Sequence, residues 1–371
     1  MEGLLQGLLA IEWQMLVMWV IGGVLIYLAI VKDMEPTLLL PMGFGAILCN
    51  LPMAFESTGV GHVLEILFNA GIDTELFPLL LFIGIGAMID FGPLLSNPRL
   101  LLFGAAAQFG IFMTLVLARC IFGDTFALTD AGAIAIIGAA DGPTSILVAQ
   151  AFGTKYLGAT TVAAYSYMAQ VPVVQPPFIK LVTTKKERLI RMPYNPQNVT
   201  KTTRILFPII VTVIAGIAAP MSAALVGFLM FGNLIRECGV LNSLSETAQK
   251  VLANLVTLFL GITVATRMQH TAFLQWETIM IIGLGLVAFI FDTVGGVLFA
   301  KPLNLFLKNK VNPMIGAAGI SAFPMSSRVV HKMGLQEDPQ NFLLMHAAGA
   351  NVAGQIASVI AGGMILSLIA H

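Results

Sequence analysis

Runs of apolar residues separated by short polar turns extend along most of the chain. Many of them approach the roughly 20 residues that a helix needs to cross the hydrocarbon core of a bilayer. The pattern predicts a helical membrane protein with room for on the order of ten crossings. We expect helices at about 15–32, 36–54, 76–91, 99–122, 128–150 and 157–181, and then at about 205–219, 221–236, 247–265, 276–300, 312–330 and 341–370.

Two stretches depart from this pattern. Residues 55–75 are more polar and less regular, which favours an interfacial or re-entrant segment. Residues 1–14 carry Glu2 and Glu12 but no Lys or Arg, so they lack the basic flank of a signal peptide. We expect them to lie at the membrane interface.

The two halves of the chain share short sequence matches in the same order. The matches are 137–140 with 315–318, 81–85 with 258–262, and 43–44 with 227–228. Their offsets, 177 to 184 residues, are nearly constant, and a constant offset is the signature of a duplicated fold. Between the halves lies a basic stretch, 180–204, whose single acid is Glu187. The positive-inside rule places this stretch in the cytoplasm.

Loop charge indicates how the second copy is oriented. The loop before residues 137–140 carries Asp124 and Asp130, whereas the loop before residues 315–318 carries Lys301, Lys308 and Lys310. Because lysines favour the cytoplasmic side, the two loops are expected on opposite sides of the membrane.

The fold class follows from these observations. We predict an all-α polytopic membrane protein with two inverted-topology repeats and matched broken helices near the midplane. The first membrane repeat spans 1–179, the basic cytoplasmic linker spans 180–204, and the second membrane repeat spans 205–371.

Composition narrows the classes of function. Charged residues make up 10% of the 371 residues, against roughly 25% in an ordinary soluble protein. Any water-soluble catalytic domain must therefore belong to another chain. The 19 basic and 19 acidic residues balance, which leaves no basic face for nucleic acid. The three cysteines are far apart and lie in or beside apolar stretches, which predicts packing roles.

Polar residues interrupt both matched apolar runs. In the first, Asp141 is followed directly by Gly and Pro, and in the second Asn312, Gly316, Ser321 and Arg328 surround further prolines and glycines. In inverted-repeat transporters the ion site lies where such helices break. Carboxylate, amide and hydroxyl oxygens suit a hard cation such as Na⁺, and Asp141 is the one acid in the set.

Each of these residues also has a structural interpretation. Asp141 fits a helix N-cap paired with a nearby cation, and Arg328 fits an arginine whose head reaches the interface. Asn312 and Ser321 fit ordinary hydrogen bonding between helices. Intramembrane acids are nevertheless functional by default, so we favour an ion-binding role for Asp141.

The last apolar run of each half adds further candidates. Asn351, Gln355 and Ser358 are spaced four and three apart, so they share one helix face, which is expected to face the protein interior or a water-filled cavity. Tyr165, Ser166, Tyr167 and Gln170 occupy the corresponding run of the first half. His346 fits either a proton relay or, more commonly, a hydrogen-bonded packing residue. We expect Asp90, Arg119, Arg267 and Asp292, near the ends of apolar runs, to be solvated at the interface.

Three long motifs resemble a known family. They are Asp141-Gly142-Pro143-Thr144, the string from Asn312 through Gly316 and Ser321 to Arg328, and residues 339–346 with 351–356. Together they resemble the β subunit of the sodium-pumping biotin-dependent decarboxylases, which include the oxaloacetate, methylmalonyl-CoA and glutaconyl-CoA decarboxylases. The resemblance covers nearly the whole chain.

The resemblance implies a membrane subunit that decarboxylates carboxybiotin on a partner subunit and couples CO₂ release and proton uptake to outward Na⁺ transport. It implies Na⁺ and carboxybiotin as ligands and a cell inner (plasma) membrane location. The implied partners are a carboxyltransferase subunit, a biotin carrier subunit or domain, a small membrane-anchoring subunit and further copies of this chain. The alternative reading is an Na⁺-coupled secondary transporter or Na⁺/H⁺ antiporter, because periodicity and charge fit it equally.

Roles for single residues follow from the same resemblance. By analogy, Asp141 and Asn312 ligate Na⁺, and Gly316 and Tyr167 belong to the functional set. Ser321 serves a second ion or proton site, and Arg328 meets the carboxybiotin carboxylate or stabilises the empty site. Asn351 and Ser358 are additional candidate ion ligands from their position on the last apolar run.

Overall fold

The structure, a computed structural model, describes residues 9–32, 35–52, 54–55, 59–123, 125–193 and 199–369. Asp124 and the first eight residues of the expected interfacial lead-in lie outside the described residues. The described part is helical and contains no strand. Five of its helices are long and apolar enough to cross a membrane, or six if the bent pair α4 and α5 counts as one span. The expectation of an all-α polytopic membrane protein is therefore confirmed.

The helices follow the apolar runs of the sequence. In the first half they are α2 (Trp13–Val31), α3 (Pro36–Cys49), α4 (Val60–Gly71), α5 (Leu76–Met88), α6 (Gly92–Ser96), α7 (Leu101–Ala107), α8 (Phe109–Phe122), α9 (Leu128–Ala135), α10 (Gly142–Ala151), α11 (Leu157–Val182) and α12 (Lys185–Arg188). In the second half they are α13 (Lys201–Ala218), α14 (Ala223–Glu237), α15 (Asn242–Thr247), α16 (Ala253–Val264), α17 (His270–Phe273), α18 (Trp276–Phe306), α19 (Met314–Ala317), α20 (Met325–Glu337) and α21 (Leu344–Ile369).

The number of long spans is smaller than the roughly ten crossings that the sequence allows. The reason is that several apolar runs are interrupted and form pairs of short helices. Residues 128–150 form α9 and α10, and residues 312–330 contain α19 and part of α20. In the irregular stretch 55–75, α4 meets α5 at an angle of 62°, the geometry of a broken span or a re-entrant segment.

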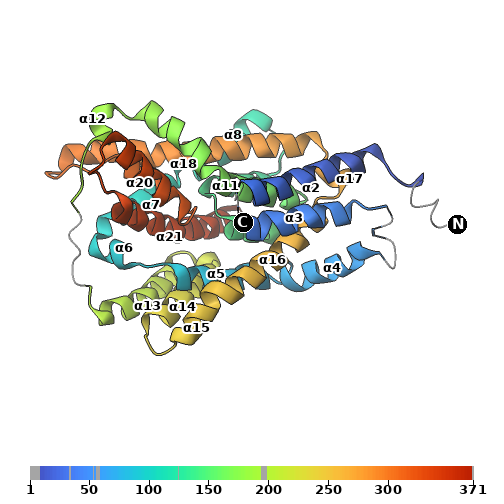
Figure 1. The fold of residues 1–371 in the computed structure, drawn as a ribbon, viewed down its shortest axis with the longest axis horizontal. Coiled ribbons are helices and arrows are strands. Elements are labelled where there is room, and N and C mark those ends of the chain that lie inside the picture. Colours follow the sequence, from blue (N-terminus) through green and yellow to red (C-terminus); the bar gives the residue numbers. More distant parts are fainter. Residues whose placement is uncertain are drawn as a thin grey trace.

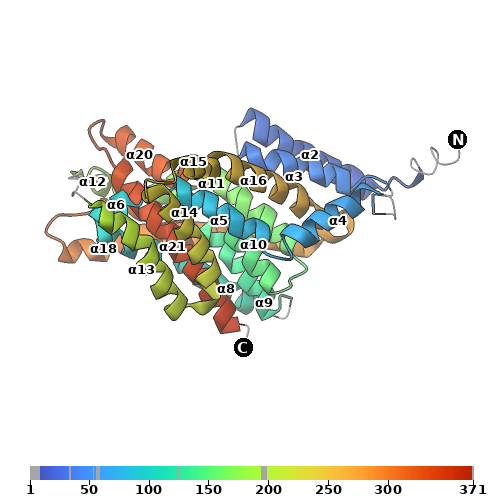
Figure 2. The ribbon, with the colours of Figure 1, turned by 90° about the horizontal axis from the view of Figure 1, so that it is seen from below.

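Helix contacts separate most of the molecule into two groups. The flanking bundle consists of α2, α3, α5, α13, α14 and α16, in which α3 packs on α16 and α5 packs on α14. The broken-helix bundle consists of α7 to α11 and α18 to α21, in which α18 packs on α8, α11 and α19. In Figure 1, α13, α14 and α15 lie along one edge of the molecule and α8 and α18 along the opposite edge. Figure 2 shows α2, α3 and α4 together at the end of the molecule near the N-terminus.

The two interruptions of the broken-helix bundle touch each other. The first lies where the 3₁₀ turn η2 (Ile136–Ala139) ends, at Ala140, which has a left-handed φ of 50°. The second lies between α19 and α20. Both the backbone N–H and the hydroxyl of Ser321 in the second donate to the carbonyl oxygen of Ala139 in the first, at 3.0 and 3.1 Å. These bonds bring the two breaks into direct contact.

Gly316 allows α19 to approach α18 closely. A Cβ atom at Gly316 would lie 1.9 Å from the carbonyl oxygen of Gly296, and a Cβ atom at Gly296 would lie 2.1 Å from the carbonyl oxygen of Gly316. Neither position has space for a side chain, so the two backbones are in direct contact. This contact fixes the start of the second interruption against the longest helix of the protein.

We expect Gly316→Ala to destabilise the protein by about 1–3 kcal/mol, because the added methyl group forces α19 away from α18. Gly283→Ala is the control, since Gly283 lies on α18, the helix that Gly316 contacts, but has no atom within 4 Å of an added Cβ. Thermal unfolding of both purified variants in detergent measures the difference. Equal midpoints for the two variants would contradict the packing role.

Candidate functional site

Asp141 caps the N-terminus of α10 from the first interruption. Its Oδ1 atom accepts from the backbone N–H of Thr144 at 3.3 Å, and its Oδ2 atom accepts from the Thr144 hydroxyl at 2.7 Å. The sequence explains this geometry, because an Asp followed by Gly and Pro is a typical helix start. The positive end of the α10 dipole also favours a negative charge here. The N-cap part of the structural interpretation is therefore confirmed, whereas the nearby cation that it included is not found among the described residues.

Side chains on the polar face of α21 donate hydrogen bonds to both interruptions. The Ser358 hydroxyl donates to Asp141 Oδ2 at 2.8 Å. The Asn351 side-chain amide donates to the carbonyl of Ile320 at 2.7 Å, and the Gln355 amide donates to the carbonyl of Ser321. Backbone carbonyls freed by a helix break must find donors inside a membrane protein. The prediction that this face points into the protein is confirmed. Its amides donate to the backbone carbonyls that the second break leaves without helical partners.

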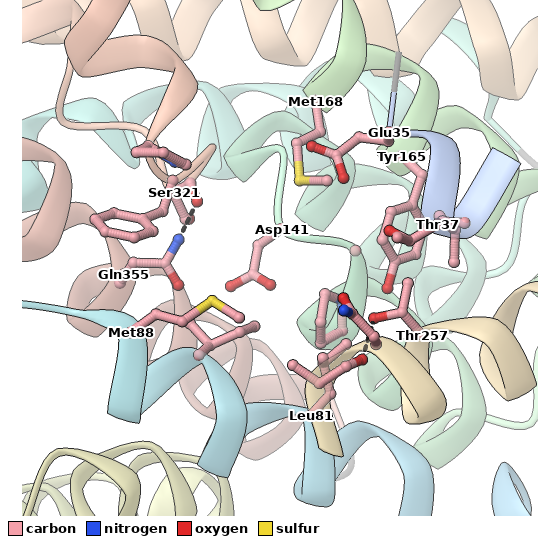
Figure 3. A pocket seen from close by; sticks show the side chains of 18 residues that line it. Glu35, Thr37, Leu81, Met88, Asp141, Tyr165, Met168, Thr257, Ser321 and Gln355 are labelled. Carbon is pink, nitrogen blue, oxygen red and sulfur yellow. Dashed lines mark hydrogen bonds between the residues drawn. The ribbon is translucent and has the colours of Figure 1, made fainter. Parts of the chain in front are cut away.

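A cavity of about 270 Å³ lies between the two bundles, with Asp141 in its wall. From the broken-helix bundle it is lined by Asp141, Tyr165, Ser321 and Gln355, among others. From the flanking bundle it is lined by residues at the start of α3, on α5 and on α16. Figure 3 shows the Asp141 carboxyl group in the middle of this space, with Ser321 and Gln355 on one side and Tyr165, Thr37 and Thr257 on the other.

The Asp141 carboxyl group is buried without a basic partner. Its residue is 3% exposed, and within the part of the chain that the structure describes no Lys, Arg or His nitrogen lies within salt-bridge distance. Three hydrogen bonds from protein groups support its negative charge but do not neutralise it. An ionised carboxylate in a membrane interior is costly unless a counter-charge is present. The site therefore favours a bound cation or a proton.

One further acceptor near the second interruption has no donor. Asn351 is fully buried, and its Oδ1 atom has no hydrogen-bond partner among the described residues. The amide nitrogen of the same side chain is already used by the carbonyl of Ile320. Asn351 thus presents an unused oxygen in an interior where such oxygens are normally paired.

Asn312 occupies a different place from Asp141 and does not line the cavity. Its side-chain amide donates to the carbonyls of Arg188 and Ile190, at 2.8 and 2.9 Å, and its Oδ1 atom accepts from the N–H of Met314. Asn312 therefore fastens the basic linker to the start of α19. The shared ligation of one ion by Asp141 and Asn312 stays a prediction.

Ion pairs hold the same linker against the end of α20. Arg188 pairs with Glu337 at 2.6 Å and Arg191 with Asp338 at 2.5 Å. The Arg191 guanidinium donates to Asp338 and holds the pKa of that carboxyl group below its usual range. The C-terminal end of α20 therefore lies on the same side of the membrane as the linker, whose expected cytoplasmic position stays a prediction.

Two other candidates lie outside the cavity. Arg328 is exposed on α20. Tyr167 is buried on α11, where its hydroxyl donates to the carbonyl of Ile282 and its ring stacks on Phe289 with centroids 6.2 Å apart. The neighbouring Tyr165, rather than Tyr167, lines the cavity.

The flanking bundle contributes polar residues that the sequence analysis missed. Glu35 and Thr37 at the start of α3, and Asn254 and Thr257 on α16, line the cavity opposite Asp141. The three-residue spacing of Asn254 and Thr257 within an apolar run was a usable signal, because it places both on one helix face. Nothing local distinguishes Glu35 from an interfacial acid.

The expectation for Asp292 was wrong. Asp292 is fully buried on α18, and its Oδ1 atom accepts from the backbone N–H of Ile111 at 3.1 Å, in the first turn of α8. It reaches this N–H because α18 packs closely on α8 at Gly110 and on η2 at Gly138, where an added Cβ atom would lie 2.5 and 2.8 Å from its carboxylate oxygens. By contrast, Arg267 is exposed, as expected.

We expect Asp292→Leu to destabilise the protein by about 1–3 kcal/mol, because the Ile111 N–H loses its side-chain acceptor. Asp292→Asn keeps an oxygen acceptor and should remain close to the wild type. Thermal unfolding in detergent compares the two variants. A leucine variant as stable as the asparagine variant would argue against the capping role.

The fold and the site together define a class of protein, a polytopic helical membrane protein with an acidic, oxygen-lined cavity at the contact of two interrupted helices. Within this class, the family sequence model described as Na⁺-transporting oxaloacetate decarboxylase beta subunit matches residues 14–369. The chain belongs to this family, and the resemblance drawn from its motifs is confirmed.

Three relatives whose names give different substrates are similar to this chain along nearly its full length. The glutaconyl-CoA decarboxylase subunit beta of Acidaminococcus fermentans is 48% identical, over 98% of this chain and 95% of that protein. The methylmalonyl-CoA decarboxylase subunit beta of Propionigenium modestum is 46% identical, over 95% and 94%. The oxaloacetate decarboxylase beta chain of Klebsiella pneumoniae is 44% identical, over 95% and 94%.

Proposed function

We propose that this chain is the membrane subunit of a sodium-pumping decarboxylase, in which it decarboxylates carboxybiotin on a partner subunit and couples CO₂ release and proton uptake to outward Na⁺ transport. The observation that carries the proposal is the buried Asp141 carboxyl group, which has hydroxyl and backbone donors but no basic partner in the described structure. Membership of the family assigns the cation and the coupled reaction.

The oxygen atoms around Asp141 suit Na⁺ as the transported substrate. Na⁺ is a hard cation that prefers oxygen ligands, by the same chemistry that governs Ca²⁺ and Mg²⁺. Asp141 supplies the negative charge, and the hydroxyls of Thr144 and Ser358, which already contact it, retain lone pairs for an ion. The unused Oδ1 atom of Asn351 is a further candidate ligand. Together these groups would replace part of the hydration shell of Na⁺.

Carboxybiotin is expected to react at a poorly hydrated cavity open to the cytoplasmic side. The bond between the ureido nitrogen and the carboxyl carbon breaks, CO₂ leaves, and the nitrogen takes up a proton. Because the reactant is charged and CO₂ is neutral, removal of water from the carboxylate favours its loss. Ser321, which lines the cavity, is the candidate for a second ion or proton site. Arg328, on a helix that ends at the cytoplasmic side, is the candidate partner of the carboxylate.

The remaining candidates are assigned supporting roles. Asn312 and Gly316 position the second break, the first by fastening the linker and the second by allowing close contact with α18. Tyr167 positions α11 against α18 through its bond to Ile282. In these roles the three residues position the helices, and other groups would contact the ion.

The chain is proposed to consist of two inverted repeats, 1–179 and 205–371, joined by the linker 180–204. Helix contacts support the duplication, because they are reciprocal. Helix α3 packs on α16 while α5 packs on α14, and α2 packs on α3 as α13 packs on α14. Such an exchange of equivalent partners is what a two-fold relationship between halves produces. An axis in the membrane plane agrees with the opposite loop charges.

The proposed partners follow from the family. They are a carboxyltransferase subunit, a biotin carrier subunit or domain, a small membrane-anchoring subunit and further copies of this chain. The named acyl substrates of the relatives differ, whereas the cavity described here would meet only carboxybiotin. The same β subunit architecture can therefore serve decarboxylases of different acids.

We expect Asp141→Asn to abolish both Na⁺ transport into inverted membrane vesicles and Na⁺-dependent carboxybiotin decarboxylation, because the amide removes the buried negative charge that a bound Na⁺ would balance. The complex should still assemble on avidin through its biotin carrier. Asp292→Asn is the control, since it neutralises the other fully buried acid away from the cavity. Normal Na⁺ dependence in Asp141→Asn would exclude the proposed ion site, and Na⁺ exchange without carboxybiotin would favour an antiporter.

We expect Ser358→Ala to raise the Na⁺ concentration for half-maximal decarboxylation about tenfold, since one lost ligand oxygen is worth about 1.4 kcal/mol. Ser367→Ala is the matched control, because Ser367 lies on the same helix and its hydroxyl bonds only to the backbone of Gly363. Steady-state kinetics across Na⁺ concentrations measure both. An unchanged Na⁺ requirement in Ser358→Ala would remove Ser358 from the ligand set.

A further inference from the structure

A second and larger cavity lies at the cytoplasmic end of the broken-helix bundle. Its volume is about 600 Å³, and none of its lining residues also lines the cavity of Asp141. It is enclosed by the beginning of α7, the loop that follows α18, and the linker at residues 190–193. The proposed function makes no use of it.

The charged residues that line this cavity are all basic. They are Arg99, Arg191, Lys308 and Lys310, and no Asp or Glu lines it. Arg191 is paired with Asp338, but within the described residues no carboxylate lies within salt-bridge distance of Arg99, Lys308 or Lys310. The three unpaired charges converge from two segments far apart in the sequence. Such a concentration of positive charge in a concave site attracts anions.

The margin of this cavity is apolar and exposed. Leu102 lines the cavity and is 48% exposed, while Leu305 and Phe306 on the last turn of α18 are 83% and 86% exposed. With 31 residues, α18 is about 46 Å long, whereas the hydrocarbon core is about 30 Å thick. The end of α18 therefore lies near the level of the lipid headgroups, with its exposed Leu and Phe beside the basic cavity.

We propose that this cavity binds the phosphate headgroup of an anionic phospholipid from the cytoplasmic leaflet. Arg99, Lys308 and Lys310 contact the phosphate, and the acyl chains lie along Leu102, Leu305 and Phe306. A basic pocket between membrane helices on the cytoplasmic side is the geometry that recognises anionic headgroups. The apolar margin favours a lipid over a soluble anion, because a free phosphate has no group that would cover exposed Leu and Phe side chains.

The test uses the full-length chain in detergent, titrated with short-chain phosphatidylglycerol and followed by native mass spectrometry. The double variant Lys308→Gln/Lys310→Gln should weaken binding about thirtyfold, since each basic residue contributes slightly more than about fivefold. The control Lys185→Gln/Lys186→Gln removes two exposed lysines from the same cytoplasmic face outside the cavity, and it should stay within about twofold of the wild type. Thermal unfolding verifies that both double variants fold.

Four results would overturn the proposal. Equal losses of phosphatidylglycerol binding in both double variants would indicate an effect of general surface charge. Equal affinity for phosphatidylcholine would show that the anionic headgroup is not recognised. Binding of inorganic phosphate alone with the same affinity would indicate a soluble anion. Unchanged phosphatidylglycerol binding with a raised KM for the biotin carrier would assign the basic surface to a protein partner instead. The binding measurements do not depend on Na⁺ transport, so they are independent of the ion site proposed at Asp141.

Discussion

The burial of one carboxyl group, that of Asp141, is the constraint on which the rest of the structure depends. A charge in this position is tolerated only where polar groups converge on it, and lipid-facing helices cannot supply such groups. Breaking the first helix aims the N-terminus of α10 at Asp141, and the second break comes within hydrogen-bonding distance of the first through Ser321. Each break in turn frees backbone carbonyls. Ser321 donates to the carbonyl of Ala139 in the first break, and the amides of Asn351 and Gln355 donate to carbonyls in the second. The polar face of α21 is thus required by the same charge.

Much of this arrangement could be predicted from the sequence, because its physical requirements produce recognisable patterns over short stretches of residues. Apolar runs indicate the helices, and an acid followed by Gly and Pro inside such a run indicates a helix start where a helix would otherwise continue. The four-and-three spacing of Asn351, Gln355 and Ser358 is visible because polar residues on one face of an apolar helix need a common destination. The direct bond of Ser358 to Asp141 shows that this destination includes the buried Asp141 carboxyl group.

Other features depend on contacts between segments that are distant in the sequence, and no local sequence pattern indicates them. Asp292 was placed at the interface because charges near the ends of apolar runs usually lie there, yet its depth is set by the packing of α18 on α8. Asn312 resembles an ion ligand, but its amide is used by the linker, whose path the sequence does not indicate. The cavity wall formed by Thr37 and Asn254 comes from the flanking bundle, and only the fold brings it opposite Asp141.

The distribution of ligands between the two bundles bears on how an ion could cross. Thr144 and Ser358, the residues that donate to Asp141, both belong to the broken-helix bundle. The flanking bundle lines the opposite side of the cavity, and among the described residues it donates no hydrogen bond to Asp141. A displacement of one bundle against the other would therefore change the wall that covers the site while leaving the groups around the ion intact. Such a division would let the oxygen groups around Asp141 keep their arrangement while the access to them alternates, which is how inverted-repeat transporters move an ion past a fixed site.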